Sequence, residues 1–104
     1  MDDAPQEPVK PIDVAAIERW ISIPADQDVV LHITRGTFDH LYFALQALAG
    51  SQIAFQSAMS DITNNRPEDA SKNDQMAKEK MVLAVEHMTR MMEAVMQRAE
   101  PING

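Results

Sequence analysis

Three histidines are the residues of this sequence best suited to metal or proton chemistry. His32, His40 and His87 are never three or four residues apart, so no two of them share one face of a single helix. Glu86 directly precedes His87, and adjacent helical side chains point about 100° apart. Di-iron helical bundles instead repeat Glu-x-x-His on facing helices. We therefore predict no metal site and interpret the histidines as solvated or singly hydrogen-bonded.

The motifs that assemble a catalytic centre are also missing from the sequence. It contains no cysteine, no Gly-rich phosphate loop and no nucleophile elbow. Asp39 and His40 adjoin at the start of a predicted helix, where the helix dipole alone favours an acid. We therefore expect a protein that is not an enzyme, with no catalytic residues and no cofactor.

The distribution of charge argues against nucleic acid as a partner. The chain has 16 Asp and Glu against 9 Lys and Arg, a formal net charge of −7, and residues 36–63 contain no base. Binding to a phosphate backbone normally relies on clustered Lys and Arg. The acidic amino terminus also lacks the positive region and apolar stretch of a secretory signal, so we expect a cytoplasmic protein.

The first third of the chain is predicted to carry little of the core. Residues 1–11 combine three prolines with acids, a composition typical of a disordered tail. Within residues 12–36, Asp13 is placed to cap a short helix. Residues 28–34 alternate β-branched side chains and are a candidate short strand, with a helix continuing from Pro24 as the alternative.

A long helix is predicted over residues 37–63, with Thr37 as its cap. Large apolar residues recur at spacings of three and four and form a heptad stripe. The stripe consists of Phe38, Leu41, Leu45, Leu48, Phe55, Met59 and Ile62, with Gln52 in its one polar position. Small residues elsewhere on the helix allow close approach, namely Ala47, Gly50, Ala54, Ser57 and Ala58. Residues 41–60 carry no charge, but their three glutamines argue against a membrane span.

A second helix is predicted over residues 72–100, after a polar turn at 64–74 and before a tail at 101–104. Ser71 and Asp74 resemble a capping box, although Pro67 is an alternative helix start. Apolar residues, including Met81, Val85, Met88, Met92 and Val95, form a stripe opposite a row of Glu79, Glu86, Glu93 and Glu100. We expect this row to be solvated and Glu86 to pair with Arg90.

Two helices of about 40 Å joined by a short turn predict an antiparallel hairpin within residues 37–100. Because one hairpin buries little surface, we predict a mainly α-helical homodimer that forms a four-helix bundle. Its expected interface contains Phe38, Leu41, Leu45, Leu48, Gln52, Phe55, Met59, Ile62, Met81, Met88, Met92 and Val95. The expected function is a non-catalytic, acidic interaction module, such as an assembly subunit, adaptor or small chaperone, with an unidentified protein partner. The methionines fit either a core or a partner groove.

One resemblance provides an alternative function. The order VVLHIT, TFDHLYFALQALAG, SQIAFQSAM resembles ribbon-helix-helix regulators if Gly50 breaks the long helix. The resemblance implies an antitoxin-type dimer whose paired strands read the DNA major groove. The outward strand residues would be Val30, His32 and Thr34, or else Val29, Leu31 and Ile33, and neither set is suited to contacting bases.

Overall fold

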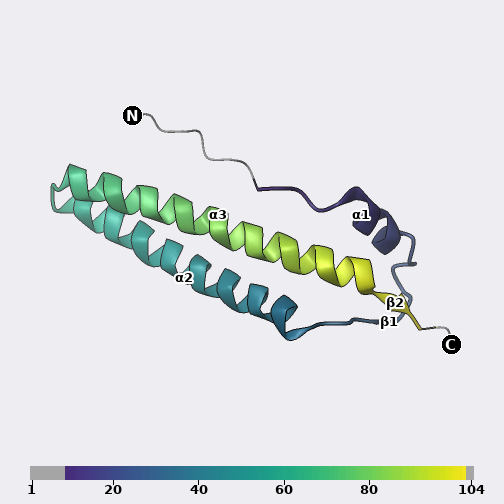
Figure 1. The fold of residues 1–104 in the computed structure, drawn as a ribbon. Coiled ribbons are helices and arrows are strands. Elements are labelled where there is room, and N and C mark those ends of the chain that lie inside the picture. Colours follow the sequence, from purple (N-terminus) through teal and green to yellow (C-terminus); the bar gives the residue numbers. More distant parts are fainter. Residues whose placement is uncertain (1–8, 103–104) are drawn as a thin grey trace.

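Two long helices, α2 (Arg35–Thr63) and α3 (Pro67–Arg98), form an antiparallel hairpin, which confirms the predicted helical hairpin (Figure 1). The short helix α1 (Val14–Ile21) packs against α3 near the open end of the hairpin (Figure 1). Strand β1 (Val29–Val30) pairs antiparallel with β2 (Glu100–Pro101). This computed structural model describes residues 9–102, so most of the predicted tail at 1–11 and the last two residues of the chain lie outside the described residues.

The helix starts follow from side-chain caps. Asp13 caps α1 as predicted, because its carboxylate accepts a hydrogen bond from the Ala15 N–H at 3.2 Å. Helix α2 begins earlier than predicted. The hydroxyl of Thr34 accepts a hydrogen bond from the Thr37 N–H at 3.1 Å, so Thr34 is the cap and the assignment of Thr37 was wrong by about one turn.

The turn between the long helices is much shorter than the predicted 64–74. It consists of residues 64–66, and Asn65 adopts φ 59°, a left-handed conformation that asparagine tolerates. Pro67 then starts α3, where its missing N–H costs nothing, so the alternative start was the right one. The proposed capping box is wrong, because Ser71 and Asp74 lie inside α3 and Asp74 pairs with Lys78 at 2.9 Å.

A buried carboxylate ties the turn to both helices. Asp61, only 7% exposed, accepts a hydrogen bond from Asn73 Nδ2 at 2.7 Å and forms an ion pair with Arg66 Nη2 at 3.1 Å. The backbone N–H of Arg66 also donates to the Asp61 carbonyl at 2.7 Å. This arrangement fixes the direction in which α3 leaves the turn.

Replacing Asp61 with alanine is expected to lower the free energy of unfolding by about 1–3 kcal/mol, because the half-buried amide of Asn73 loses its acceptor and Arg66 loses its ion-pair partner. Urea denaturation followed by circular dichroism measures this loss. Asp26→Ala is the control, since Asp26 is exposed outside the hairpin. Equal stability of the two variants would contradict a structural role for the Asp61 network.

The hairpin seam is made of small residues. On α2 the buried positions are Thr37, Ala44, Ala47, Ser51, Ala54, Ala58 and Asp61, and on α3 they are Ala70, Ala77 and Ala84. Short side chains let the two backbones approach closely. The buried Ser51 hydroxyl is satisfied by donating to the Ala77 carbonyl at 2.8 Å. Every buried apolar residue in the described chain is an alanine, so the hairpin has no core of large side chains.

The carboxyl end of α3 also differs from the prediction. The helix ends at Arg98 rather than Glu100, and Ala99, fully buried, is already extended. Glu100 and Pro101 then pair with β1, which reduces the candidate strand at 28–34 to its two valines. The predicted tail at 101–104 therefore begins as a strand.

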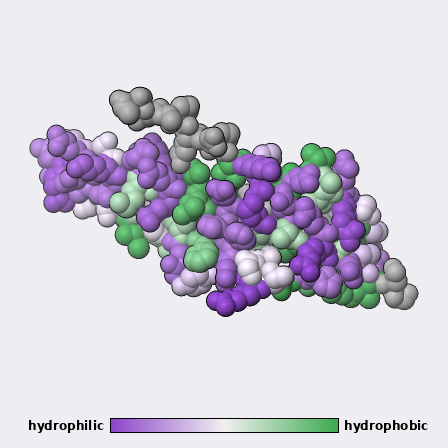
Figure 2. All heavy atoms as spheres, in the orientation of Figure 1, coloured by the Kyte–Doolittle hydropathy of each residue, from purple (hydrophilic) through white to green (hydrophobic). Residues whose placement is uncertain are grey.

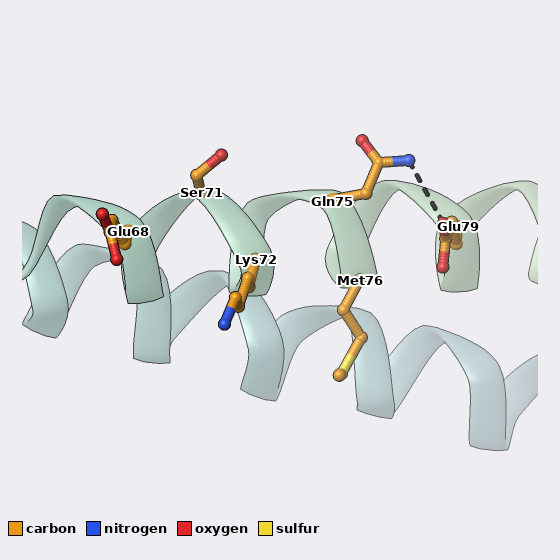
Figure 3. Close-up of a pocket in the computed structure, with 6 residues that line it drawn as sticks. All are labelled: Glu68, Ser71, Lys72, Gln75, Met76 and Glu79. Atoms are coloured by element: carbon orange, nitrogen blue, oxygen red, sulfur yellow. Dashed lines mark hydrogen bonds between the residues drawn. The ribbon is translucent and has the colours of Figure 1, made fainter. Parts of the chain in front are cut away.

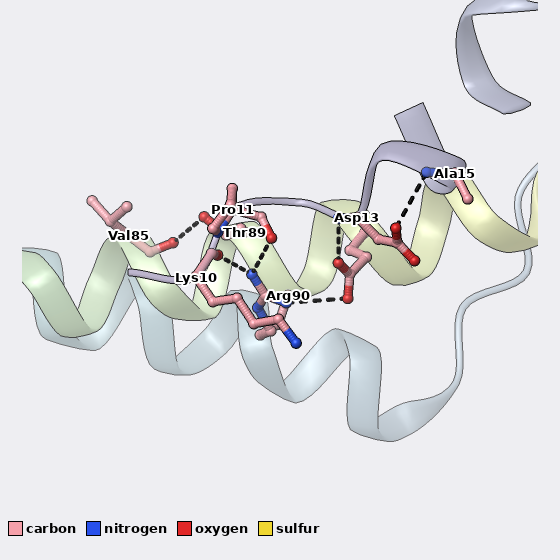
Figure 4. A network of polar contacts seen from close by, with 8 residues as sticks. Lys10, Pro11, Asp13, Ala15, Val85, Thr89 and Arg90 are labelled. Atoms are coloured by element: carbon pink, nitrogen blue, oxygen red, sulfur yellow. Dashed lines mark hydrogen bonds and ion pairs between the residues drawn. The ribbon is translucent and has the colours of Figure 1, made fainter. Parts of the chain in front are cut away.

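Helix α1 is held on α3 by a polar network (Figure 4). Arg90 pairs with Glu93 at 3.1 Å and donates to the carbonyls of Lys10 and Pro11. Glu93 also accepts from the Asp13 N–H at 2.7 Å. Two predictions were therefore wrong, because Glu93 is covered rather than solvated and Arg90 pairs with Glu93 instead of Glu86.

Candidate functional site: an exposed apolar flank of the hairpin

The heptad stripe predicted from the sequence lies beside the hairpin seam rather than in it. Each buried α2 position, such as Ala44, Ala47, Ser51 or Ala54, is followed directly by a stripe residue. Because adjacent helical residues differ by about 100° in direction, the large side chains are turned onto one side of the hairpin. We call this surface the Leu/Met flank. It comprises Phe38, Leu41, Leu45, Leu48, Gln52, Phe55, Met59 and Ile62 of α2 with Met81, Met88, Met92 and Val95 of α3.

The Leu/Met flank remains open to solvent in a single chain. Leu41 and Val95 are half-buried, and the other ten members are exposed. Nine of these are large apolar side chains with exposed fractions between 37% and 63%. Apolar side chains also reach the surface at several places along the molecule in the face drawn in Figure 2. The flank methionines Met81, Met88 and Met92 are thus exposed on the surface of one chain.

A groove on the flank is lined by residues of both long helices. Gln52 and Phe55 of α2 and Met81 of α3 line it, which shows that the stripes of the two helices lie on the same side of the hairpin. Asp74 and Lys78 of α3 also line the groove. The groove therefore offers an aromatic ring, a thioether and an amide, with one acid and one base beside them.

A second depression runs along α3 alone (Figure 3). Its lining consists of Glu68, Ser71, Lys72, Gln75, Met76 and Glu79, all from the first four turns of that helix. The Gln75 amide donates a hydrogen bond to the Glu79 carboxylate at 3.2 Å, so two of the polar groups that line this depression are paired with each other. Since no second element supplies an opposing wall, this surface does not have the convergent groups of a catalytic or ligand site.

The opposite flank carries a cluster that the sequence analysis missed. His40 of α2 and His87 of α3 meet with Nδ1 atoms 2.9 Å apart, and the ring of Phe43 lies 5.6 Å from that of His87. The search for histidines spaced along one helix could not find a pair formed between two helices. The register of the two helices could have identified the pair, because it determines which residue of α3 faces His40.

The remaining structural findings restrict other interpretations of the described residues. Between residues 9 and 102, no three or more His, Asp or Glu side chains gather as a metal-ion site. No helix in that range has both the length and the apolar character needed to cross a membrane. Helix α2 continues through Gly50, so the helix break that a ribbon-helix-helix arrangement needs is not present, and β1 pairs within its own chain.

Comparison with protein-family models, with curated proteins and with solved structures finds no match to this chain.

Proposed function

We propose that this protein is a non-catalytic interaction module that acts as a homodimer through the Leu/Met flank. The observation that supports this proposal is that the large apolar side chains of the flank are exposed while the buried apolar positions hold only small ones. The buried apolar residues of the described chain are all alanines, while Phe38, Leu45, Phe55 and other large side chains of the flank are exposed. Burying these side chains against a second molecule supplies the core that one hairpin lacks.

The size of the flank fits a stable interface. If a fully exposed side chain of this kind presents about 200 Å², the nine exposed apolar members together present roughly 900 Å² per copy. A standard protein–protein interface buries about 800 Å² per partner. The largest apolar patch on a typical monomer is only about 300–600 Å².

A second copy of the chain is the partner that requires no further component. A two-fold axis places the same patch on both molecules, so one apolar flank covers the other and the assembly closes. Two hairpins joined in this way form a four-helix bundle whose centre contains the Leu, Phe and Met side chains. The small-residue seams then hold each hairpin together, and the large side chains hold the dimer together.

The dimer leaves the acidic character of the chain on its outer surface. Glu68, Glu79 and Glu86 are exposed, and the chain as a whole has a formal net charge of −7. An acidic bundle without a catalytic centre suits a role as an assembly subunit, adaptor or small chaperone that contacts another protein.

The mass in solution tests the homodimer directly. Light scattering and sedimentation equilibrium at micromolar concentration should give twice the chain mass of 11.6 kDa. A mass of one chain across that concentration range would refute the homodimer.

Gln52 carries a more specific prediction for this interface. It is exposed on the flank between Leu48 and Phe55, where an amide would face an apolar surface in the dimer. Gln52→Leu is therefore expected to raise the melting temperature at a fixed protein concentration and to loosen the choice of oligomer, because a polar group at such a position specifies register at a cost in stability. Thermal melting together with sedimentation measures both effects. A lower melting temperature with the dimer unchanged would contradict the assigned role.

A further inference from the structure

The histidine pair on the opposite flank joins the two long helices through their side chains. His40 belongs to α2 and His87 to α3, yet their Nδ1 atoms lie 2.9 Å apart and their ring centroids 5.2 Å apart. Both residues are half-buried, so solvent still reaches them. One Nδ1–H donates to the other Nδ1, which means that both nitrogens point toward one small volume between the helices.

We infer that His40 and His87 form a two-imidazole site for a borderline divalent cation such as Zn²⁺ or Ni²⁺. Imidazole nitrogen is a preferred ligand of these ions, and Mg²⁺ or Ca²⁺ would select oxygen instead. Two nitrogens that each bind a metal at about 2.0–2.1 Å lie about 2.8–3.0 Å apart as neighbours in square-planar geometry and about 3.3–3.4 Å apart in tetrahedral geometry. The observed Nδ1 separation of 2.9 Å lies within the square-planar range, and each ring would turn so that its Nδ1 lone pair points at the ion rather than along the line to the other nitrogen.

Metal binding at this pair conserves the protons of two neutral imidazoles. In the free protein one ring carries its proton on Nδ1 and shares it with the other ring. When the cation binds, both Nδ1 lone pairs coordinate it, and the proton of the donor ring moves to Nε2 of the same ring through solvent. Each imidazole remains neutral, and no oxidant or reductant is needed.

The surroundings define what kind of site this is. Within residues 9–102 no group of three or more His, Asp or Glu side chains could hold a metal, so water would complete the coordination shell of an ion at the pair. The Phe43 ring packs beside His87 and restricts the ring on one side. Such a site exchanges its ion readily, and its main consequence is to link α2 to α3.

This site is independent of the proposed dimer. Phe43, which packs on His87, lies seven residues before Gly50 on α2, and Lys80 lies seven residues before His87 on α3, so both pairs lie on the same side of the hairpin. A Cβ on Gly50 would meet the Lys80 side chain at 2.9 Å, as expected for that arrangement. The groove lined by Gln52, Phe55 and Met81 is on the other side. An ion bound at the pair would therefore leave the Leu/Met flank free.

Calorimetric titration of the full chain with Zn²⁺ tests the inference. One Zn²⁺ per chain is expected for the unmodified protein, with affinity at least tenfold weaker in His40→Gln and in His87→Gln. His32→Gln is the matched control, because the third histidine contacts Glu100 at 3.5 Å instead of another imidazole. Absence of Zn²⁺ binding, or affinity unchanged by both pair variants, would overturn the site.

A second measurement distinguishes the site from unspecific zinc binding and from misfolding of a variant. Zn²⁺ should move the imidazole NMR signals of His40 and His87 together and leave those of His32 in place. It should also raise the melting temperature of the unmodified protein and of His32→Gln, but not that of His87→Gln, whose helix content is checked by circular dichroism. Equal zinc stabilisation of all three proteins would show that the ion binds elsewhere.

Discussion

Phe55→Glu is expected to dissociate the homodimer, weakening its association by about a hundredfold or more. Phe55 is 51% exposed and lies in the groove at the middle of the Leu/Met flank, where large aromatic side chains contribute most to an interface. In a two-fold dimer the substitution occurs twice, and each copy would place a carboxylate against an apolar surface. Sedimentation equilibrium over a concentration series measures the change in dissociation constant.

Ile53→Glu provides the matched control for this substitution. Ile53 lies on the same helix, is 65% exposed and undergoes the same change from an apolar to an acidic side chain. It lies outside the Leu/Met flank, so the Ile53→Glu protein should remain dimeric. If both variants dissociate equally, the interface is not restricted to the Leu/Met flank. If neither variant dissociates, the flank is not the interface.

Ala54→Leu is expected to lower the free energy of unfolding by about 1–3 kcal/mol because it overpacks the seam between the two helices. Ala54 is 4% exposed and lies in the small-residue seam, where three additional carbons force the helices apart. For a domain of this size, 1 kcal/mol corresponds to a fall in melting temperature of about 4–8 °C. Chemical denaturation at a fixed protein concentration measures the loss.

The control for the seam is the same substitution at an exposed alanine of the same helix. Ala49 is exposed, so Ala49→Leu should leave stability nearly unchanged. A fall of equal size in both variants would indicate an effect of leucine on α2 as a whole. An unchanged Ala54→Leu protein would contradict close packing at the seam.

Local signals in the sequence were sufficient to predict the main elements. Asp13 identified the start of α1, and the run of helix-compatible residues identified α2 to within two residues at its start. The boundaries of α3 were less accurate, because residues 67–71 contain no large apolar side chain and were assigned to the turn. Ala70 indicates the earlier start of α3, because it continues the seven-residue repeat of Ala77 and Ala84.

That error in the turn explains why the histidine pair was missed. In the structure Ser51 faces Ala77 and His40 faces His87, so the numbers of facing residues add up to about 128. A turn over 64–74 has its centre four residues later, which would raise that sum by eight to about 136 and place His40 opposite Met96, near the end of α3. A change of a few residues in the turn therefore moves every contact across a hairpin, because each helix is rigid.

The sequence by itself determined that the chain forms two long helices with two parallel stripes, one of large and one of small side chains. Periodicity cannot select between these stripes, because the two follow the same seven-residue repeat one position apart on α2. Only the tertiary structure decided that the alanine stripe closes the hairpin while Phe38, Phe55 and their neighbours remain outside. The physical reason is close packing: short side chains let two helices of one chain approach closely, and the larger side chains are left exposed beside them.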